Sequence, residues 1–94
     1  MKNRNYLYEE LKKISQEDMV LQHLKDFNHI TSWEAFVEYG ITRLSARILT
    51  LRQKGWIINT DYVVRINRYG RPVRFGKYTL KGHINMQPLT EIEI

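Results

Sequence analysis

The sequence predicts an α+β fold in which three helices precede a β-hairpin. Apolar residues recur at helical spacing in three segments between residues 15 and 54, and two of these segments open with a capping signature. After Gly55 the period becomes that of a strand, with β-branched and aromatic residues on both sides of a turn cluster at residues 67–72. Since the chain has 94 residues, we expect one domain with one modest core.

The N-terminal part predicts two helices. Residues 3–14 carry an apolar stripe that predicts an extra helix. This helix is an arm packed on the domain, a dimer contact, or simply a packed or frayed end of the chain. Ser15, with Asp18 three residues later, predicts the N-cap of a helix that runs to about Phe27. Its expected buried face holds Val20, Leu24 and Phe27.

A short strand and a second capped helix follow. His29 and Ile30 are too few for an independent strand but suit the first strand of a small sheet. Thr31 and Glu34 predict a capping box. Gly40 suits the left-handed position at the end of this helix. The expected buried side chains of the helix are Trp33, Phe36 and Val37.

The third helix, expected over residues 43–54, is the candidate recognition element. Thr42 is its expected N-cap, and Gly55 its expected C-terminal glycine. Leu44, Ile48 and Leu51 share one face, which predicts core positions. Beside them we expect a basic face with small residues, typical of a helix that enters a major groove, made of Arg43, Ala46, Arg47, Thr50 and Lys54.

The hairpin is the second basic element. Its tip and arms carry five cations with no acid among them, which predicts contact with a phosphate backbone: Arg65, Arg68, Arg71, Arg74 and Lys77. Tyr69 at the tip is more simply an ordinary turn aromatic than a stacking residue. Residues 41–82 hold ten Lys or Arg against Asp61 alone, whereas the two flanking segments are each net acidic. This concentration of positive charge predicts a polyanionic partner.

The order of signals between Ser15 and Leu80 resembles a family of small phage and prophage winged helix-turn-helix domains. The matching marks are Ile30–Ala35, the stretch Gly40–Ile48, Leu51 with Arg52, Gly55, and Gly76–Leu80. The resemblance implies a winged-helix fold, a bacterial host cytoplasm and DNA binding. It places recognition positions at Arg43, Ser45, Ala46 and Arg47, and the wing at about Arg65–Arg74. The expected domain organisation is a helical arm at 1–14, the winged-helix domain at 15–81 and a C-terminal tail at 82–94.

Enzymatic chemistry is not expected. The chain lacks cysteine, an HExxH pair and a glycine-rich phosphate loop, so no catalytic residue, metal or cofactor is predicted. Apolar runs are too short to span a membrane, and a secretory signal peptide is not expected.

Two functions remain open. The first is a double-stranded DNA binder, such as a transcription regulator or an architectural excision factor, with helix 43–54 in the major groove and wing 65–77 on the backbone. The second is a phage inhibitor of a host defence protein or nucleoprotein, of the anti-CRISPR kind, which docks through the same basic face. The sequence leaves the target, the partner and the oligomeric state open, including a homodimer.

Overall fold

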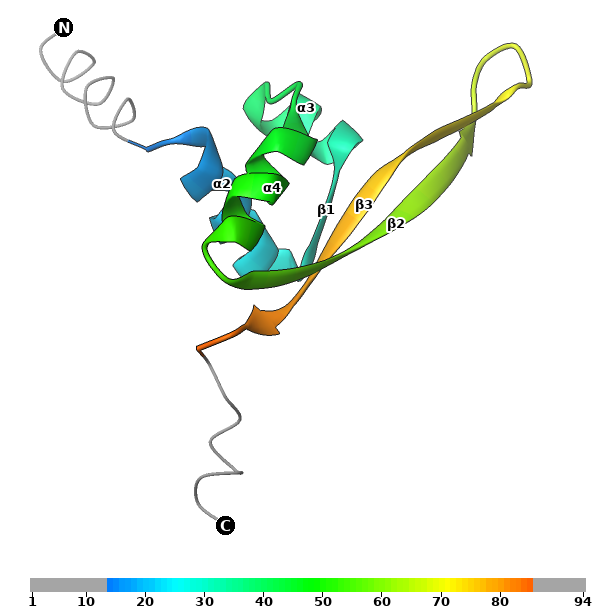
Figure 1. Cartoon of the computed structure of the whole chain (residues 1–94). Helices are drawn as coiled ribbons and strands as arrows, with labels where there is room; N and C mark the ends of the chain where they lie inside the picture. Colours follow the sequence, from blue (N-terminus) through cyan, green and yellow to red (C-terminus); the bar gives the residue numbers. More distant parts are fainter. Residues whose placement is uncertain (1–13, 86–94) are drawn as a thin grey trace, which may run out of the picture.

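The structure of the protein, a computed structural model, describes residues 14–85. In it, three helices pack on a small sheet (Figure 1). The elements are α2 (Gln16–Phe27), β1 (His29–Thr31), α3 (Ser32–Tyr39), α4 (Leu44–Gln53), β2 (Trp56–Ile66) and β3 (Pro72–His83). This order confirms the α+β prediction. The expected N-terminal helix at residues 3–14 and most of the expected tail at 82–94 lie outside the described residues.

Local capping fixes where the first helices begin and end. The Ser15 side chain accepts the backbone N–H of Asp18 at 3.0 Å, which starts α2. Thr31 and Glu34 form a complete capping box at α3, with bonds of 2.9 and 3.0 Å. Gly40 then ends α3 with a φ of 70°, a left-handed conformation that favours glycine. The predicted caps at these positions are confirmed.

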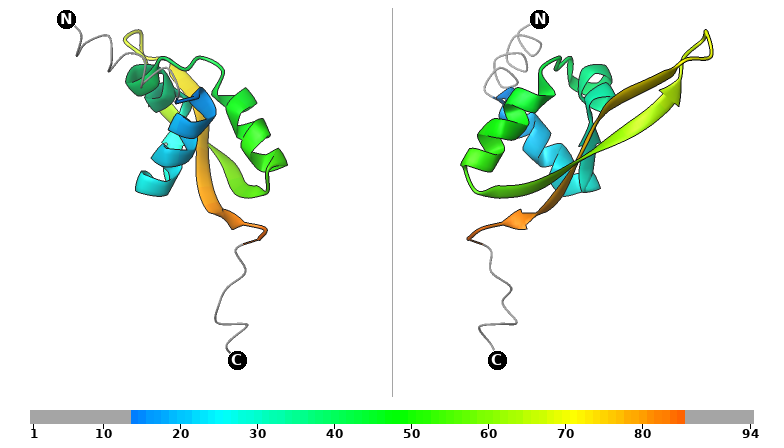
Figure 2. Two further views of the ribbon diagram at one scale, coloured as in Figure 1. Left: turned by 90° about the vertical axis from the view of Figure 1, so that its left-hand side faces the viewer. Right: turned by 45° about the vertical axis from the view of Figure 1, so that its right-hand side comes forward.

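The sheet is antiparallel, with strand order β1-β3-β2. Strand β1 pairs with β3 through His29↔Thr79 and Thr31↔Lys77, as expected for a short first strand. Strands β2 and β3 form one long hairpin with a register shift between Ile57 and Ile58. The far half of this hairpin extends beyond the helices, as Figure 1 and the right-hand view of Figure 2 show.

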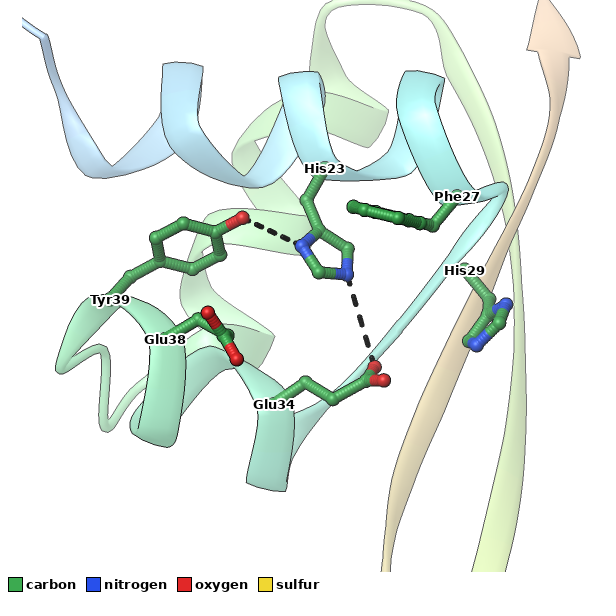
Figure 3. Close-up of a pocket in the computed structure, with 6 residues that line it drawn as sticks. All are labelled: His23, Phe27, His29, Glu34, Glu38 and Tyr39. Atoms are coloured by element: carbon green, nitrogen blue, oxygen red, sulfur yellow. Dashed lines mark hydrogen bonds and ion pairs between the residues drawn. The ribbon is translucent and has the colours of Figure 1, made fainter.

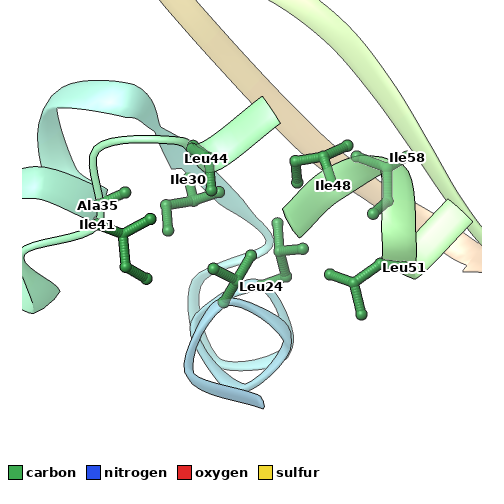
Figure 4. Packing of buried hydrophobic residues seen from close by; sticks show 9 residues of the cluster. Leu24, Ile30, Ala35, Ile41, Leu44, Ile48, Leu51 and Ile58 are labelled. Atoms are coloured by element: carbon green, nitrogen blue, oxygen red, sulfur yellow. The ribbon is translucent and has the colours of Figure 1, made fainter. Parts of the chain in front are cut away.

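The core lies between the three helices and one face of the sheet (Figure 4). Leu44, Ile48 and Leu51 of α4 are all buried there, which confirms the predicted core stripe. Leu24 of α2 and Ile30 of β1 are fully buried beside them. The hydrophobic effect therefore joins every helix to the sheet through one continuous cluster.

The expected buried face of α3 is wrong. Trp33, Phe36 and Val37 are 61%, 51% and 56% exposed. The helix packs on the body through Ala35, which is fully buried, and through the half-buried Tyr39 one turn later. Residues three and four positions apart share a helix face, so the three large side chains fall on the opposite side. Phe27 of α2, also an expected core residue, is 60% exposed.

The expected N-cap of the third helix is also wrong. Arg43 occupies the N-cap position and makes no side-chain capping bond, and the helix runs from Leu44 to Gln53. Thr42 lies one residue before this N-cap position, next to Ile41, which is buried in the turn. Gly55 follows the C-cap Lys54 with a φ of 103°, which confirms the expected glycine.

Candidate nucleic-acid interface

Two polar contacts fix the orientation of α4. On one flank, the Lys54 ammonium lies 2.6 Å from the Glu17 carboxylate of α2. On the other flank, the Arg52 guanidinium donates to the Ile58 carbonyl of β2. With one side against the core and these flanks against α2 and β2, the remaining side of α4 faces outward, and its exposed residues are Ser45, Leu49 and Gln53.

The expected basic face of α4 is divided by this orientation. Arg43 is exposed at the N-terminus. Arg47 is half-buried, and its Nε is buried without a hydrogen-bond partner within residues 14–85. Thr50 donates its hydroxyl to the Ala46 carbonyl at 3.1 Å. Since Arg47 and Lys54 are seven residues apart, they share the flank that faces α2.

Side chains alternate between the two faces of the hairpin, and the expected wing cations alternate with them. Arg74 lies on the same face as the core residue Ile58, and its guanidinium carbon is 4.3 Å from the centre of the Tyr62 ring. Arg65 and Lys77 lie on the other face, where they line a hollow beside Trp33. The three cations on the strands therefore lie on two faces of the hairpin instead of one.

The turn at the hairpin tip is held by Asn67. Its side-chain oxygen accepts the backbone N–H groups of Tyr69 at 2.9 Å and Arg71 at 3.0 Å. Gly70 completes the turn with a φ of 79°. Arg68, Tyr69 and Arg71 are exposed at this tip. Within the described part of the chain, no ion pair neutralises the tip arginines.

A separate polar hollow of about 320 Å³ lies between α2, α3 and β1 (Figure 3). His23 Nδ1 lies 2.7 Å from the Tyr39 hydroxyl, and His23 Nε2 is 4.0 Å from Glu34. Burial raises the pKa of Tyr39 above its ordinary value, and the nearby carboxylates of Glu38, Asp26 and Glu34 raise it further. This network ties α2 to α3, and none of the expected site residues takes part in it.

The comparison with protein families decides the kind of domain. A family described as a winged helix-turn-helix domain matches residues 15–82, which is more than half of the chain. The chain belongs to this winged helix-turn-helix family. Comparison with curated proteins and with solved structures finds no match.

In this winged helix-turn-helix domain, α3 and α4 are the two helices joined by the tight turn. The β2–β3 hairpin is the wing. Three expected recognition residues lie at the N-terminal end of α4 or on its outward side, namely Arg43, Ser45 and Ala46. Leu49 and Gln53 share that outward side, although they were not among the site residues predicted from the sequence. Their position opposite the Leu44–Ile48–Leu51 stripe was the available signal.

Within residues 14–85, no group of three or more His, Asp or Glu residues could hold a metal ion. No helix in the same range is long and apolar enough to cross a membrane.

Proposed function

We propose that this protein binds double-stranded DNA, with α4 in the major groove and the wing along the phosphate backbone. The observation that carries the proposal is the outward side of α4. It exposes Ser45, Leu49 and Gln53, with Arg43 at its N-terminal end and no acidic residue in the helix. A B-DNA major groove admits an α-helix, and such a side offers donors, acceptors and an apolar contact to base edges.

The roles of the side chains follow from their positions. The Gln53 amide suits the paired donor and acceptor of adenine, and Leu49 suits a thymine methyl group. Arg43 lies beside the backbone N–H groups that open α4, and both favour a phosphate. We retain Ser45, Ala46 and Thr50 as close-packing positions, and Arg47 and Lys54 as flanking cations on the α2 side.

The wing supplies the contacts that do not depend on sequence. Arg74 stacks on Tyr62 and lies on the hairpin face that continues from the core beneath α4. Arg68 and Arg71 extend this positive charge to the exposed tip. Each phosphate neutralised by such a cation releases counterions, so affinity must fall as salt rises. This arrangement suits a regulator or an architectural factor of the excision type.

The test is fluorescence anisotropy with a labelled random duplex across a salt series that starts at about 50 mM. We expect Arg74→Ala to weaken binding to all sequences and to reduce the salt slope by about 0.9. We expect Gln53→Ala to lose about 1–3 kcal/mol on selected sequences only. Lys81→Ala is the matched control, because Lys81 is an exposed cation at the end of β3 farthest from the hairpin tip.

Two results would count against the proposal. Undetectable affinity at the lowest salt, or affinity that ignores salt, would exclude binding through these cations. A protein partner that stays bound after nuclease treatment of a host lysate, together with absent duplex affinity, would favour the defence-inhibitor interpretation instead.

A further inference from the structure

The face of the hairpin opposite α4 contains two adjoining hollows. One has a volume of about 390 Å³ and is lined by Trp33, Arg65, Asn67, Val73 and Phe75. The other, of about 260 Å³, shares three of these residues and continues toward the body of the domain. Because Trp33, Arg65 and Phe75 line both, the hollows form one channel, which we call the outer channel.

Regular elements hold the walls of the outer channel. Alternation along the strands places Arg65 of β2 and Phe75 of β3 on one face, and cross-strand pairing sets Arg65 directly opposite Val73. Trp33 enters from the first turn of α3, which the Thr31–Glu34 capping box fixes. Secondary structure therefore fixes the backbone positions from which these side chains line the channel.

The channel presents an aromatic surface that the domain itself does not bury. Trp33 is 61% exposed, and its ring lies beside that of Phe36 one turn later, with ring centres 6.3 Å apart. Phe75 is half-buried on the opposite wall. Exposed rings beside an apolar hollow favour a planar partner that can stack, and an unpaired nucleobase has such a face.

Charge along the channel favours a polyanion toward the wing tip. Arg65 and Lys77 line it, and Arg68 and Arg71 lie exposed beyond it. Glu34 lines the body end, but its carboxylate already accepts the backbone N–H of Thr31. Asp61, paired with Lys77 across the strands, accepts the backbone N–H of Tyr62. No acidic residue occurs between residues 62 and 85, so the tip end is purely cationic.

We propose that the outer channel binds single-stranded nucleic acid, with an unpaired base stacked at Trp33 and Phe75 and its phosphates at Arg65 and Lys77. Proteins that bind single strands combine a cationic groove with stacking aromatics in this way. A duplex hides its base faces inside its own stack, so it cannot use the hollow. Strand β1 pairs with residues 77–79 of β3, so the edge of β3 at residues 72–76 is open to an extended peptide. The cations at the tip end and the exposed rings favour nucleic acid over a peptide, and a peptide is one outcome of the test.

The two tryptophans make the channel directly observable. In the full-length Trp56→Phe variant, Trp33 is the only indole, and its fluorescence reports on the channel. Titration with a thymidine homopolymer of about 12 nucleotides, which spans one typical binding site, is expected to quench this fluorescence. The logarithm of the affinity should fall with the logarithm of salt by about 0.7 per neutralised phosphate.

Variants separate this site from the duplex-binding face. Anisotropy with the labelled homopolymer should show affinity about 5- to 100-fold weaker for Trp33→Ala, the range typical of one lost stacking contact. Arg65→Ala should weaken the same binding and flatten its salt dependence. Duplex affinity should stay unchanged in Trp33→Ala, whereas Arg43→Ala should lower duplex affinity alone. Circular dichroism confirms folding, and Val37→Ala is the control for an exposed α3 side chain outside the channel.

Three outcomes would overturn the proposal. The first is an unchanged Trp33 signal at saturating homopolymer. The second is single-strand affinity that survives both Trp33→Ala and Arg65→Ala. The third is quenching by a glutamate-rich apolar peptide but not by the homopolymer, which would assign the channel to a protein segment. The proposal stands on residues outside the outward side of α4, so it survives or fails independently of duplex binding.

Discussion

The guanidinium of Arg52 on α4 donates two hydrogen bonds to the backbone carbonyl of Ile58 on β2, at 3.1 Å from Nε and 2.6 Å from Nη2. Its Nη2 also donates to the Thr60 hydroxyl at 2.7 Å. One side chain thereby fixes the base of the wing against the helix that we assign to the major groove. Arg52 therefore has a structural role.

Replacing Arg52 tests this task. We expect Arg52→Ala to lower the free energy of unfolding by about 1.5–3 kcal/mol, the usual value of hydrogen bonds to a charged group. Arg65→Ala, on the open hairpin face, should change it by less than about 0.5 kcal/mol. Urea unfolding of both variants measures the difference. Equal stability of the two variants would contradict the role assigned to Arg52.

Two neighbouring residues of α4 should differ sharply in stability effect. Ile48 is fully buried, whereas Leu49 is 56% exposed. We expect Ile48→Ala to cost about 2–5 kcal/mol, because it leaves a cavity among Leu24, Leu51 and their neighbours. Leu49→Ala should stay within about 0.5 kcal/mol of the wild type. Thermal or urea unfolding measures both changes in stability. A large loss of stability in Leu49→Ala would mean that the Leu49 side chain is buried.

Two glycines offer a matched pair for backbone strain. A Cβ at Gly55, which has a φ of +103°, would lie 2.8 Å from the His83 ring. At Gly40, with a φ of +70°, a Cβ would meet nothing within 4 Å. We expect Gly40→Ala to cost about 1–2 kcal/mol from the left-handed conformation alone. Gly55→Ala should cost more, since it also displaces His83 from the Lys54 carbonyl. Urea unfolding measures the two losses, and a larger loss for Gly40→Ala would contradict the close contact between Gly55 and His83.

Tyr39 should make stability fall at high pH. Its pKa is raised in the folded state, mainly by burial, so above about pH 10 the unfolded chain releases a proton that the folded chain keeps. The stabilisation from Tyr39 in its neutral form is therefore complete below about pH 10 and is lost as the pH rises through the folded-state pKa of Tyr39.

The matched variant for this effect is Tyr39→Phe. At pH 7 it should be less stable by about 0.5–1.5 kcal/mol, because His23 loses its hydrogen bond. Between pH 9 and 11, roughly around the tyrosine pKa, the wild type should lose stability more steeply than the variant. Parallel curves from urea unfolding would show that Tyr39 does not carry this dependence.

The ion pair between Lys54 and Glu17 should restrain DNA binding. Glu17→Gln removes the only carboxylate bonded to Lys54 within residues 14–85, which frees a cation beside α4. Exposed ion pairs contribute about 0.2–1 kcal/mol, so duplex affinity should rise by a factor of roughly 1.5 to 5. Lys54→Ala should lower duplex affinity, and adding Glu17→Gln to this variant should cause no further change. Anisotropy on both single variants and the double variant measures this coupling.

The sequence predicted what short-range rules control. The capping box at Thr31 and Glu34 and the left-handed Gly40 depend on atoms a few residues apart, and both were confirmed. The stripe of Leu44, Ile48 and Leu51 was confirmed because it is long and periodic enough to allow only one buried face. The family match to residues 15–82 agrees with the same signals.

Local rules failed where the protein body decides what a side chain meets. Trp33 and Phe36 have the apolar character of core residues, yet α3 packs through the smaller Ala35 and leaves both exposed. Helical periodicity identifies that a face is apolar, but only the position of the neighbouring elements decides which face is covered. The role of Arg52 was equally hidden, because its partner belongs to a strand whose path the helix sequence does not specify.

By itself, the amino-acid sequence determined the class of fold, the limits of most elements and the concentration of cations after residue 40. Only the tertiary structure decided how those cations are shared, with Arg74 on the α4 side of the wing and Arg65 with Lys77 facing Trp33. The reason is that charge is a property of each residue, whereas the face of a hairpin on which it appears depends on strand register and on the helices packed against one side.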